Sequence, residues 1–128
     1  MACFIVPAVE AVAVTVAAQA VKKQEAKQTH AEAVIARSQS VAWSRKLRWL
    51  SWLLWGGVLL LAFEHVWHGE VVPFFPFLTA MNDPGETVEM LHEMSTVGVT
   101  MAVIVTVVWG VICFAADTIL RRSEEAVQ

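Results

Sequence analysis

Charge is scarce in this chain, and positive charge is missing from its middle. Only 16% of the residues are charged, against about a quarter in a typical soluble domain. No lysine or arginine lies between Arg48 and Arg121, and tyrosine is absent altogether. The two cysteines, Cys3 and Cys113, are too few for a disulfide framework. The net charge of −3 argues against a nucleic acid partner.

Sequence motifs of the common enzyme classes are also missing. The chain has no phosphate-binding glycine loop, no Gly-x-Ser-x-Gly elbow, no Cys-x-x-Cys pair and no c-type haem attachment motif. No catalytic residue is therefore predicted.

Long apolar runs are what the sequence does have. Residues Val97–Ala116 carry no charge over twenty positions. About 20 residues at about 1.5 Å rise cover the roughly 30 Å hydrocarbon core of a bilayer. This run predicts a transmembrane helix, and hence an integral membrane protein.

Two further runs predict two further spans. Trp49–Phe63 is uncharged but short, so its helix should continue through Glu64 and His65 until Pro73 and Pro76 stop it. Cys3–Val21 is rich in alanine and valine. A signal peptide would need positive charge before this run, and an interfacial helix would need a strongly polar face; neither is present. We therefore expect an all-α membrane protein with three transmembrane helices.

The expected organisation is a single membrane domain, 1–128. Its segments are helix 1 over about 4–21 with a cytoplasmic helical extension over 22–42, helix 2 over about 47–70, an outer loop over 71–83, a long protruding helix 3 over about 84–120, and a short tail over 121–128. Because cytoplasmic loops collect lysine and arginine, residues 22–46 and 121–128 should be cytoplasmic and 67–94 exoplasmic. The expected location is a prokaryotic cytoplasmic membrane.

The start of helix 3 has a clear signal. Asp83 is a good N-cap residue, Pro84 suits the first helical position, and Glu86 is placed for a capping box. Before it, the segment PFFPFL at 73–78 cannot be helical because of its two prolines.

Small residues recur every four positions along helix 3. This pattern allows helix backbones to approach closely in lipid, either within the chain or between copies. The predicted helix-packing seam consists of Gly98, Ala102, Thr106 and Gly110.

Three ionisable residues are expected inside the hydrocarbon: Glu10, Glu64 and His65. Such groups are costly there and usually face the protein interior, a partner or a water cavity. By helical rise, Glu10 lies about 18 Å and Glu64 about 24 Å above the cytoplasmic edge. A Glu10–His65 or Glu10–Glu64 hydrogen bond is therefore geometrically possible. Alternatively, Glu64 and His65 simply reach the outer headgroups.

A metal site is a further alternative. Glu89 and His92 have the Glu-x-x-His spacing used on helices of di-metal carboxylate proteins, and the candidate ligands are His68, Glu89, His92 and Glu93. Helical rise places Glu89 about 24 Å beyond Glu64, which weakens the idea. His65 and His68 are also possible axial haem ligands. No cofactor is predicted as the first choice.

These features favour a non-catalytic subunit of a homo-oligomeric or hetero-oligomeric membrane complex, because three thin helices cannot enclose a pathway alone. The first alternative is proton or cation conduction through an oligomer using Glu10, Glu64 and His65. The second is a metal-binding or haem-binding redox subunit.

Overall fold

The protein is described by a computed structural model over residues 2–27 and 41–126. The described part is all-helical, and three of its helices are long and apolar enough to cross a membrane. They are α1 (Ile5–Glu25), α3 (Trp43–Trp67) and a helical stretch over Pro84–Ser123. No strand occurs within the described ranges, where a single isolated bridge joins Val71 to Leu78. The predicted all-α class with three helices of spanning length is confirmed.

The helix bounds differ in detail from the expected ones. Helix α3 begins at Trp43 and ends at Trp67, earlier at both ends than the expected 47–70. Helix α1 continues past residue 21 and ends at Glu25, so it includes residues 22–25 of the expected extension over 22–42. Residues 28–40 of that extension lie outside the described residues.

The third helical stretch is continuous but not uniform. It consists of α4 (Pro84–Glu93), one π-helical turn, η2 (Met94–Gly98), and α5 (Val99–Glu125). The Asp83 carboxylate accepts hydrogen bonds from the amides of Gly85 and Glu86, at 2.7 Å and 3.3 Å, so the predicted N-cap is confirmed.

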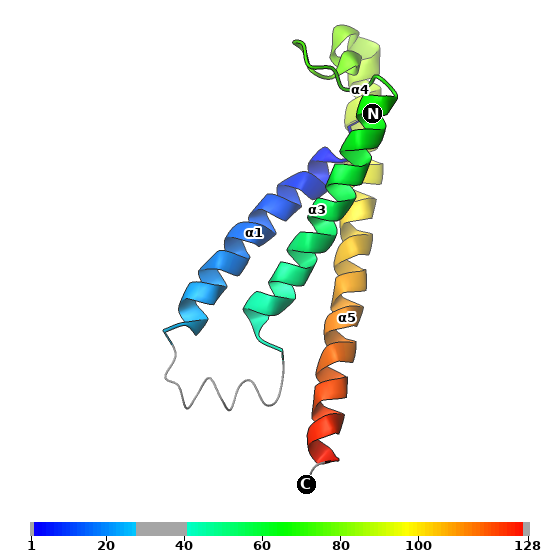
Figure 1. The fold of residues 1–128 in the computed structure, drawn as a ribbon. Coiled ribbons are helices and arrows are strands. Elements are labelled where there is room, and N and C mark those ends of the chain that lie inside the picture. Colours follow the sequence, from blue (N-terminus) through cyan, green and yellow to red (C-terminus); the bar gives the residue numbers. More distant parts are fainter. Residues whose placement is uncertain (1, 28–40, 127–128) are drawn as a thin grey trace.

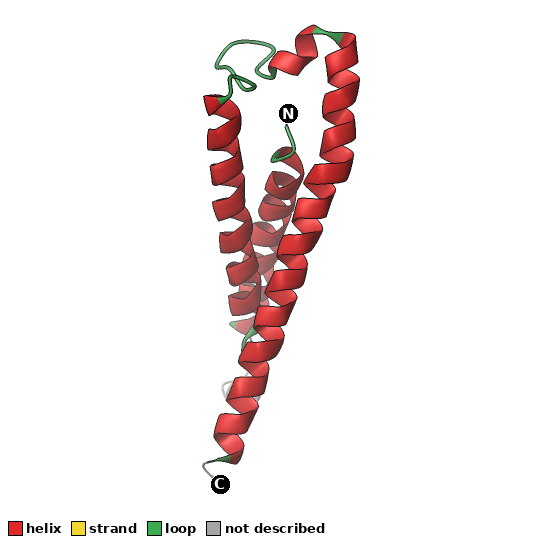
Figure 2. Cartoon of the chain, turned by 90° about the vertical axis from the view of Figure 1, so that its right-hand side faces the viewer, coloured by secondary structure: helices red, strands yellow, loops and turns green. Residues whose placement is uncertain are grey.

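The three long helices pack side by side, with α3 between α1 and α5 in the view of Figure 1. The N-terminus lies near the C-terminal end of α3, and the C-terminus lies at the opposite end of the bundle (Figures 1 and 2). We call the latter the basic end. Its described basic residues are Lys22, Lys23, Lys27, Arg45, Lys46, Arg48, Arg121 and Arg122. The other end, which includes η1 (Thr79–Asn82) and α4, is the acidic end.

Two small apolar clusters hold the bundle together. One is at the acidic end, where Ala2, Ala80 and Met90 are buried together. The other lies between α1 and α3, where Ala11, Leu50 and Leu54 are buried against Val105 and Trp109 of α5. Much of the remaining apolar surface of all three helices is exposed, as expected for helices that face lipid.

The segment between α3 and η1 forms a small turn-rich loop rather than a helix, as its prolines predict. Within it, the amide of Val72 donates to the carbonyl of Phe77 at 2.8 Å, and the amide of Thr79 donates to Glu70 at 3.0 Å. Phe77 has a φ of 63°, in the left-handed region. This loop leaves three phenylalanine side chains exposed: Phe74, Phe75 and Phe77.

Candidate functional site

Glu10 is hydrogen-bonded to Thr106, which the sequence predicts only as part of the helix-packing seam. The hydroxyl of Thr106 on α5 donates a 2.7 Å hydrogen bond to Glu10 Oε1 on α1. Both side chains are half-buried. The contact therefore ties an ionisable group within the apolar part of α1 to a neighbouring helix, and the structure gives Glu10 no hydrogen bond or ion pair to Glu64 or His65.

The predicted seam residues of η2 and α5 lie largely against α1 of the same chain. A Cβ atom added to Gly98 would lie 2.9 Å from the carbonyl oxygen of Cys3 and 3.1 Å from Val6 Cγ2. Ala102 is buried, and Thr106 bonds Glu10. Gly110 differs, since an added Cβ atom would meet nothing within 4 Å. The first three residues of the predicted seam are thus packed within the chain, and the fourth, Gly110, has no close neighbour.

His65 is the most enclosed ionisable residue at the acidic end, with 5% of its surface exposed. Its Nδ1 lies 2.6 Å from the carbonyl oxygen of Leu61, one turn earlier on α3. A carbonyl oxygen can only accept a hydrogen bond, so Nδ1 carries the proton and donates it. In the neutral ring Nε2 is then unprotonated and can accept a hydrogen bond. Nε2 faces the thiol of Cys3 at 3.5 Å and the Glu70 carboxylate at 3.7 Å.

A ring contact completes this arrangement, since Phe4 meets His65 edge-on with ring centroids 5.2 Å apart. The N-terminal residues are thus fixed to the end of α3. The sequence singled out His65 but not its contact with Cys3, because the two residues are 62 positions apart and nothing local links them.

The other predicted polar candidates lie on exposed helix surfaces. Glu64 is exposed, and its Oε1 lies 3.8 Å from Nε2 of His68, one turn later. On α4, Glu89 and His92 are exposed and Glu93 is half-buried. Over residues 2–27 and 41–126, no three histidine, cysteine or acidic side chains form a group able to hold a metal ion. The predicted metal candidates His68, Glu89, His92 and Glu93 are therefore not brought together as a ligand set.

A polar network that the sequence did not predict joins α1 to α3. The hydroxyl oxygens of Thr15 and Ser51 are 2.7 Å apart, and the indole Nε1 of Trp55 donates to Thr15 at 3.2 Å. Thr15 also donates to the carbonyl of Ala11 at 2.7 Å, so Ser51 is the donor in the hydroxyl pair. Trp55 thus has a defined hydrogen-bonding partner.

At the basic end, an ion pair links α3 to α5. Lys46 Nζ lies 2.6 Å from Asp117 Oδ2, and the side chain of Lys46 is only 9% exposed. The other carboxylate oxygen, Oδ1, accepts from the amide of Val41 at 3.1 Å. The indole of Trp109 donates to the carbonyl of Lys46 at 2.7 Å, which adds a second link between the same two helices.

Carboxylates from two other helices therefore cap the start of α3. Glu25, the last residue of α1, accepts from the amide of Ser44 at 3.1 Å and from its hydroxyl at 2.5 Å. Together with Asp117, it places negative charge at the positive end of the helix dipole. This explains why α3 begins at Trp43 although its own N-cap residue, Ala42, offers no side-chain cap.

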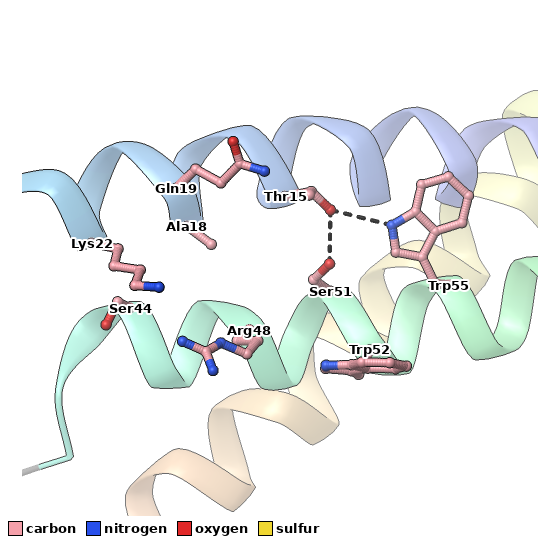
Figure 3. Close-up of a pocket in the computed structure, with 9 residues that line it drawn as sticks. All are labelled: Thr15, Ala18, Gln19, Lys22, Ser44, Arg48, Ser51, Trp52 and Trp55. Atoms are coloured by element: carbon pink, nitrogen blue, oxygen red, sulfur yellow. Dashed lines mark hydrogen bonds between the residues drawn. The ribbon is translucent and has the colours of Figure 1, made fainter.

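An open cleft of about 490 Å³ lies between α1 and α3 near the basic end (Figure 3). The Thr15–Ser51 pair spans it at one end, next to Trp55, and Lys22 and Ser44 lie at the other. Its lining is completed by Ala18, Gln19, Arg48 and Trp52.

Comparison of the chain with protein-family models, with curated proteins and with solved structures finds no match.

Proposed function

We propose that this chain is a three-span integral membrane protein that serves as a non-catalytic subunit of a larger membrane assembly. In the proposed orientation the basic end is cytoplasmic, including residues 22–46 and 121–128, and residues 67–94 are exoplasmic. Support comes from the charge distribution. The basic residues of the described chain lie at one end of three apolar helices, and cytoplasmic loops carry the excess of lysine and arginine.

One observation carries the non-catalytic part of the proposal. Every buried side-chain nitrogen and oxygen atom among the described residues has a hydrogen-bonding partner. Glu10 is engaged by Thr106, and Lys46 by Asp117. These two contacts join α1 to α5 and α3 to α5. What the chain presents to its surroundings is mainly apolar surface.

The partner surface is proposed to lie at the acidic end. Phe75 has 88% of its surface exposed and Phe74 has 74%, on a loop beyond the end of α3. Adjacent exposed aromatic side chains are typical of sites that contact another protein or the membrane interface. A second membrane subunit, or a second copy of this chain, would cover them.

Proton or cation conduction is the second candidate function. The observation in its favour is that Glu10 lies between α1 and α5 with a hydroxyl partner, and that His65 lies at one end of the same bundle beside Glu70. Glu10 and His65 contact different residues and not each other, so they do not form a continuous path within one chain. Conduction would therefore need further chains.

The test is the mass of the particle extracted in mild detergent, with identification of co-purifying chains. The proposal expects a mass above that of one chain with its detergent, and a reduced mass for Phe75→Ser. A matched change at another exposed aromatic residue, Phe114→Ser, should leave the mass unchanged. A monomer without other chains would contradict the subunit function. pH-dependent flux through liposomes that contain the purified assembly would favour conduction instead.

A further inference from the structure

We propose that the cleft between α1 and α3 at the basic end binds an anionic phospholipid. Its phosphate group would lie between Lys22 and Arg48, and one acyl chain would lie along the apolar wall of the cleft. This inference rests on the membrane insertion proposed above, and not on the identity of any protein partner.

Two cations from facing helices define the headgroup position. Lys22 is on α1 and Arg48 is on α3, and both line the cleft (Figure 3). In the described part of the chain neither forms an ion pair, whereas Lys46 is already paired with Asp117. Arginine and lysine together provide directed donors and a point charge for a phosphate. Basic pockets between membrane helices on the cytoplasmic side are suited to anionic headgroups.

Two acidic groups at the start of α3 are engaged by other partners. The Glu25 carboxylate accepts from the amide and hydroxyl of Ser44. The Asp117 carboxylate is held by Lys46 and by the amide of Val41. Neither carboxylate forms an ion pair with Lys22 or Arg48, so both cations are available to a ligand.

The remaining lining suits an acyl chain better than a soluble anion. Ala18 provides apolar surface near Lys22, and the tryptophans Trp52 and Trp55 provide it toward the opposite end of the cleft. Trp52 is 74% exposed, so an indole face is available on the open side of the cleft. The hydroxyls of Thr15 and Ser51 are occupied by each other, which leaves little polarity at that end.

Size and shape favour the same ligand. A volume of about 490 Å³ is far larger than a phosphate ion needs and falls in the range of about 300–1,000 Å³ for small-molecule sites. Because the cleft is open at its side, the rest of the lipid would extend into the bilayer. A lipid phosphate with its chain fills such a site, whereas a free phosphate would leave most of it empty.

Native mass spectrometry of the full-length, detergent-purified protein tests the proposal. The protein is titrated with phosphatidylglycerol or with zwitterionic phosphatidylcholine of the same acyl chains. We expect retained phosphatidylglycerol adducts at concentrations where phosphatidylcholine leaves none. Lys22→Gln or Arg48→Gln should each weaken phosphatidylglycerol retention by about fivefold, in line with the contribution of one basic residue to anionic lipid binding.

Matched variants separate this site from general charge attraction. Lys23→Gln and Arg45→Gln each remove one exposed positive charge at the same end without altering the cleft lining. They should reduce retention by less than twofold. Equal losses in the cleft and control variants, or equal retention of both lipids, would overturn the inference. So would full displacement of the lipid by inorganic phosphate at equal concentration, since this would indicate an anion site.

A separate experiment tests the membrane insertion on which the lipid site depends. A chain that is released from membranes by alkaline carbonate is not integral, and then both proposals fall. A chain that stays in the membrane but does not discriminate between the two lipids refutes the lipid site alone.

Discussion

The hydroxyl of Thr106 donates a 2.7 Å hydrogen bond to the side-chain oxygen Oε1 of Glu10, and so joins α5 to α1. Thr106 is also the third residue of the predicted helix-packing seam, whose small side chains recur every four positions. The polar contact and the close helix packing are therefore parts of one interface. This relationship gives Glu10 a structural role that can be tested without knowledge of a substrate.

Removing the Thr106 hydroxyl should destabilise the bundle. In Thr106→Val the shape is kept, but Glu10 loses its donor in an apolar setting, at an expected cost of about 1–2 kcal/mol. Thr106→Ser keeps the hydroxyl and should stay within about 0.5 kcal/mol of the unmodified protein. Unfolding by a denaturing detergent, followed by helical circular dichroism, measures the difference. Equal stability of the two variants would show that the bond contributes nothing.

Replacing Glu10 by glutamine should leave assembly intact. In Glu10→Gln the amide oxygen can still accept from Thr106, while the carboxyl group that could exchange a proton is removed. The subunit proposal expects an unchanged particle mass and no loss of any flux. Conduction through Glu10 would instead give normal assembly with pH-dependent flux abolished, and a similar loss for His65→Gln. A liposome assay at several pH values distinguishes the two functions.

Two glycines of the third helical stretch, Gly98 in η2 and Gly110 in α5, should respond very differently to the same change. In Gly98→Ala the new Cβ would lie 2.9 Å from a backbone oxygen of Cys3, which cannot move away without shifting α1. Overpacking of this kind costs about 1–3 kcal/mol. Gly110→Ala meets nothing within 4 Å and should be neutral or slightly stabilising, because alanine favours helix. Thermal unfolding in detergent compares the two, and a similar loss in both would argue against the α1–α5 contact.

The ion pair between Lys46 and Asp117 should contribute more to the stability of the fold than an exposed basic residue beside it. Lys46→Met leaves Asp117 without its cation and should destabilise the fold by about 2 kcal/mol, less than a fully buried pair because Asp117 is 23% exposed. Arg45→Gln, at an exposed position next to it, should have almost no effect. A double variant, Lys46→Met with Asp117→Leu, should recover part of the loss. Additive losses in the double variant would mean that the two side chains do not interact.

The sequence predicted the helices well, because a helix is signalled by the residues of its own segment: a long uncharged run along its length and a capping residue at its start. The uncharged run over Val97–Ala116 gave the third helix, and Asp83 followed by Pro84 gave its start. The prolines of PFFPFL correctly predicted the non-helical segment between α3 and η1. The orientation and the assembly remain predictions, because both depend on surroundings that a single chain does not contain.

The partners of the polar residues were harder to predict. The charge pattern predicts only that Lys46 lies in a cytoplasmic segment, and nothing in the sequence links it to Asp117, 71 positions later. Depth estimates by helical rise brought Glu10 near His65, but they ignore rotation about the helix axis. That rotation turns Glu10 toward α5 and leaves His65 with Cys3. The π-helical turn over Met94–Gly98 has no local sequence signal that we can identify.

The central claim is that three helices cross the membrane with the basic end inside the cell, and site-specific labelling tests it most directly. Single cysteines at Lys27, Asn82 and Ser123 are introduced after Cys3 and Cys113 are replaced by alanine, and an epitope tag is added before Met1. In intact cells, an impermeant maleimide should label the Asn82 site, and an antibody should reach the tag. The Lys27 and Ser123 sites should be labelled only after the membrane is opened. Labelling of the Lys27 and Asn82 sites from the same side of an intact membrane would contradict the account.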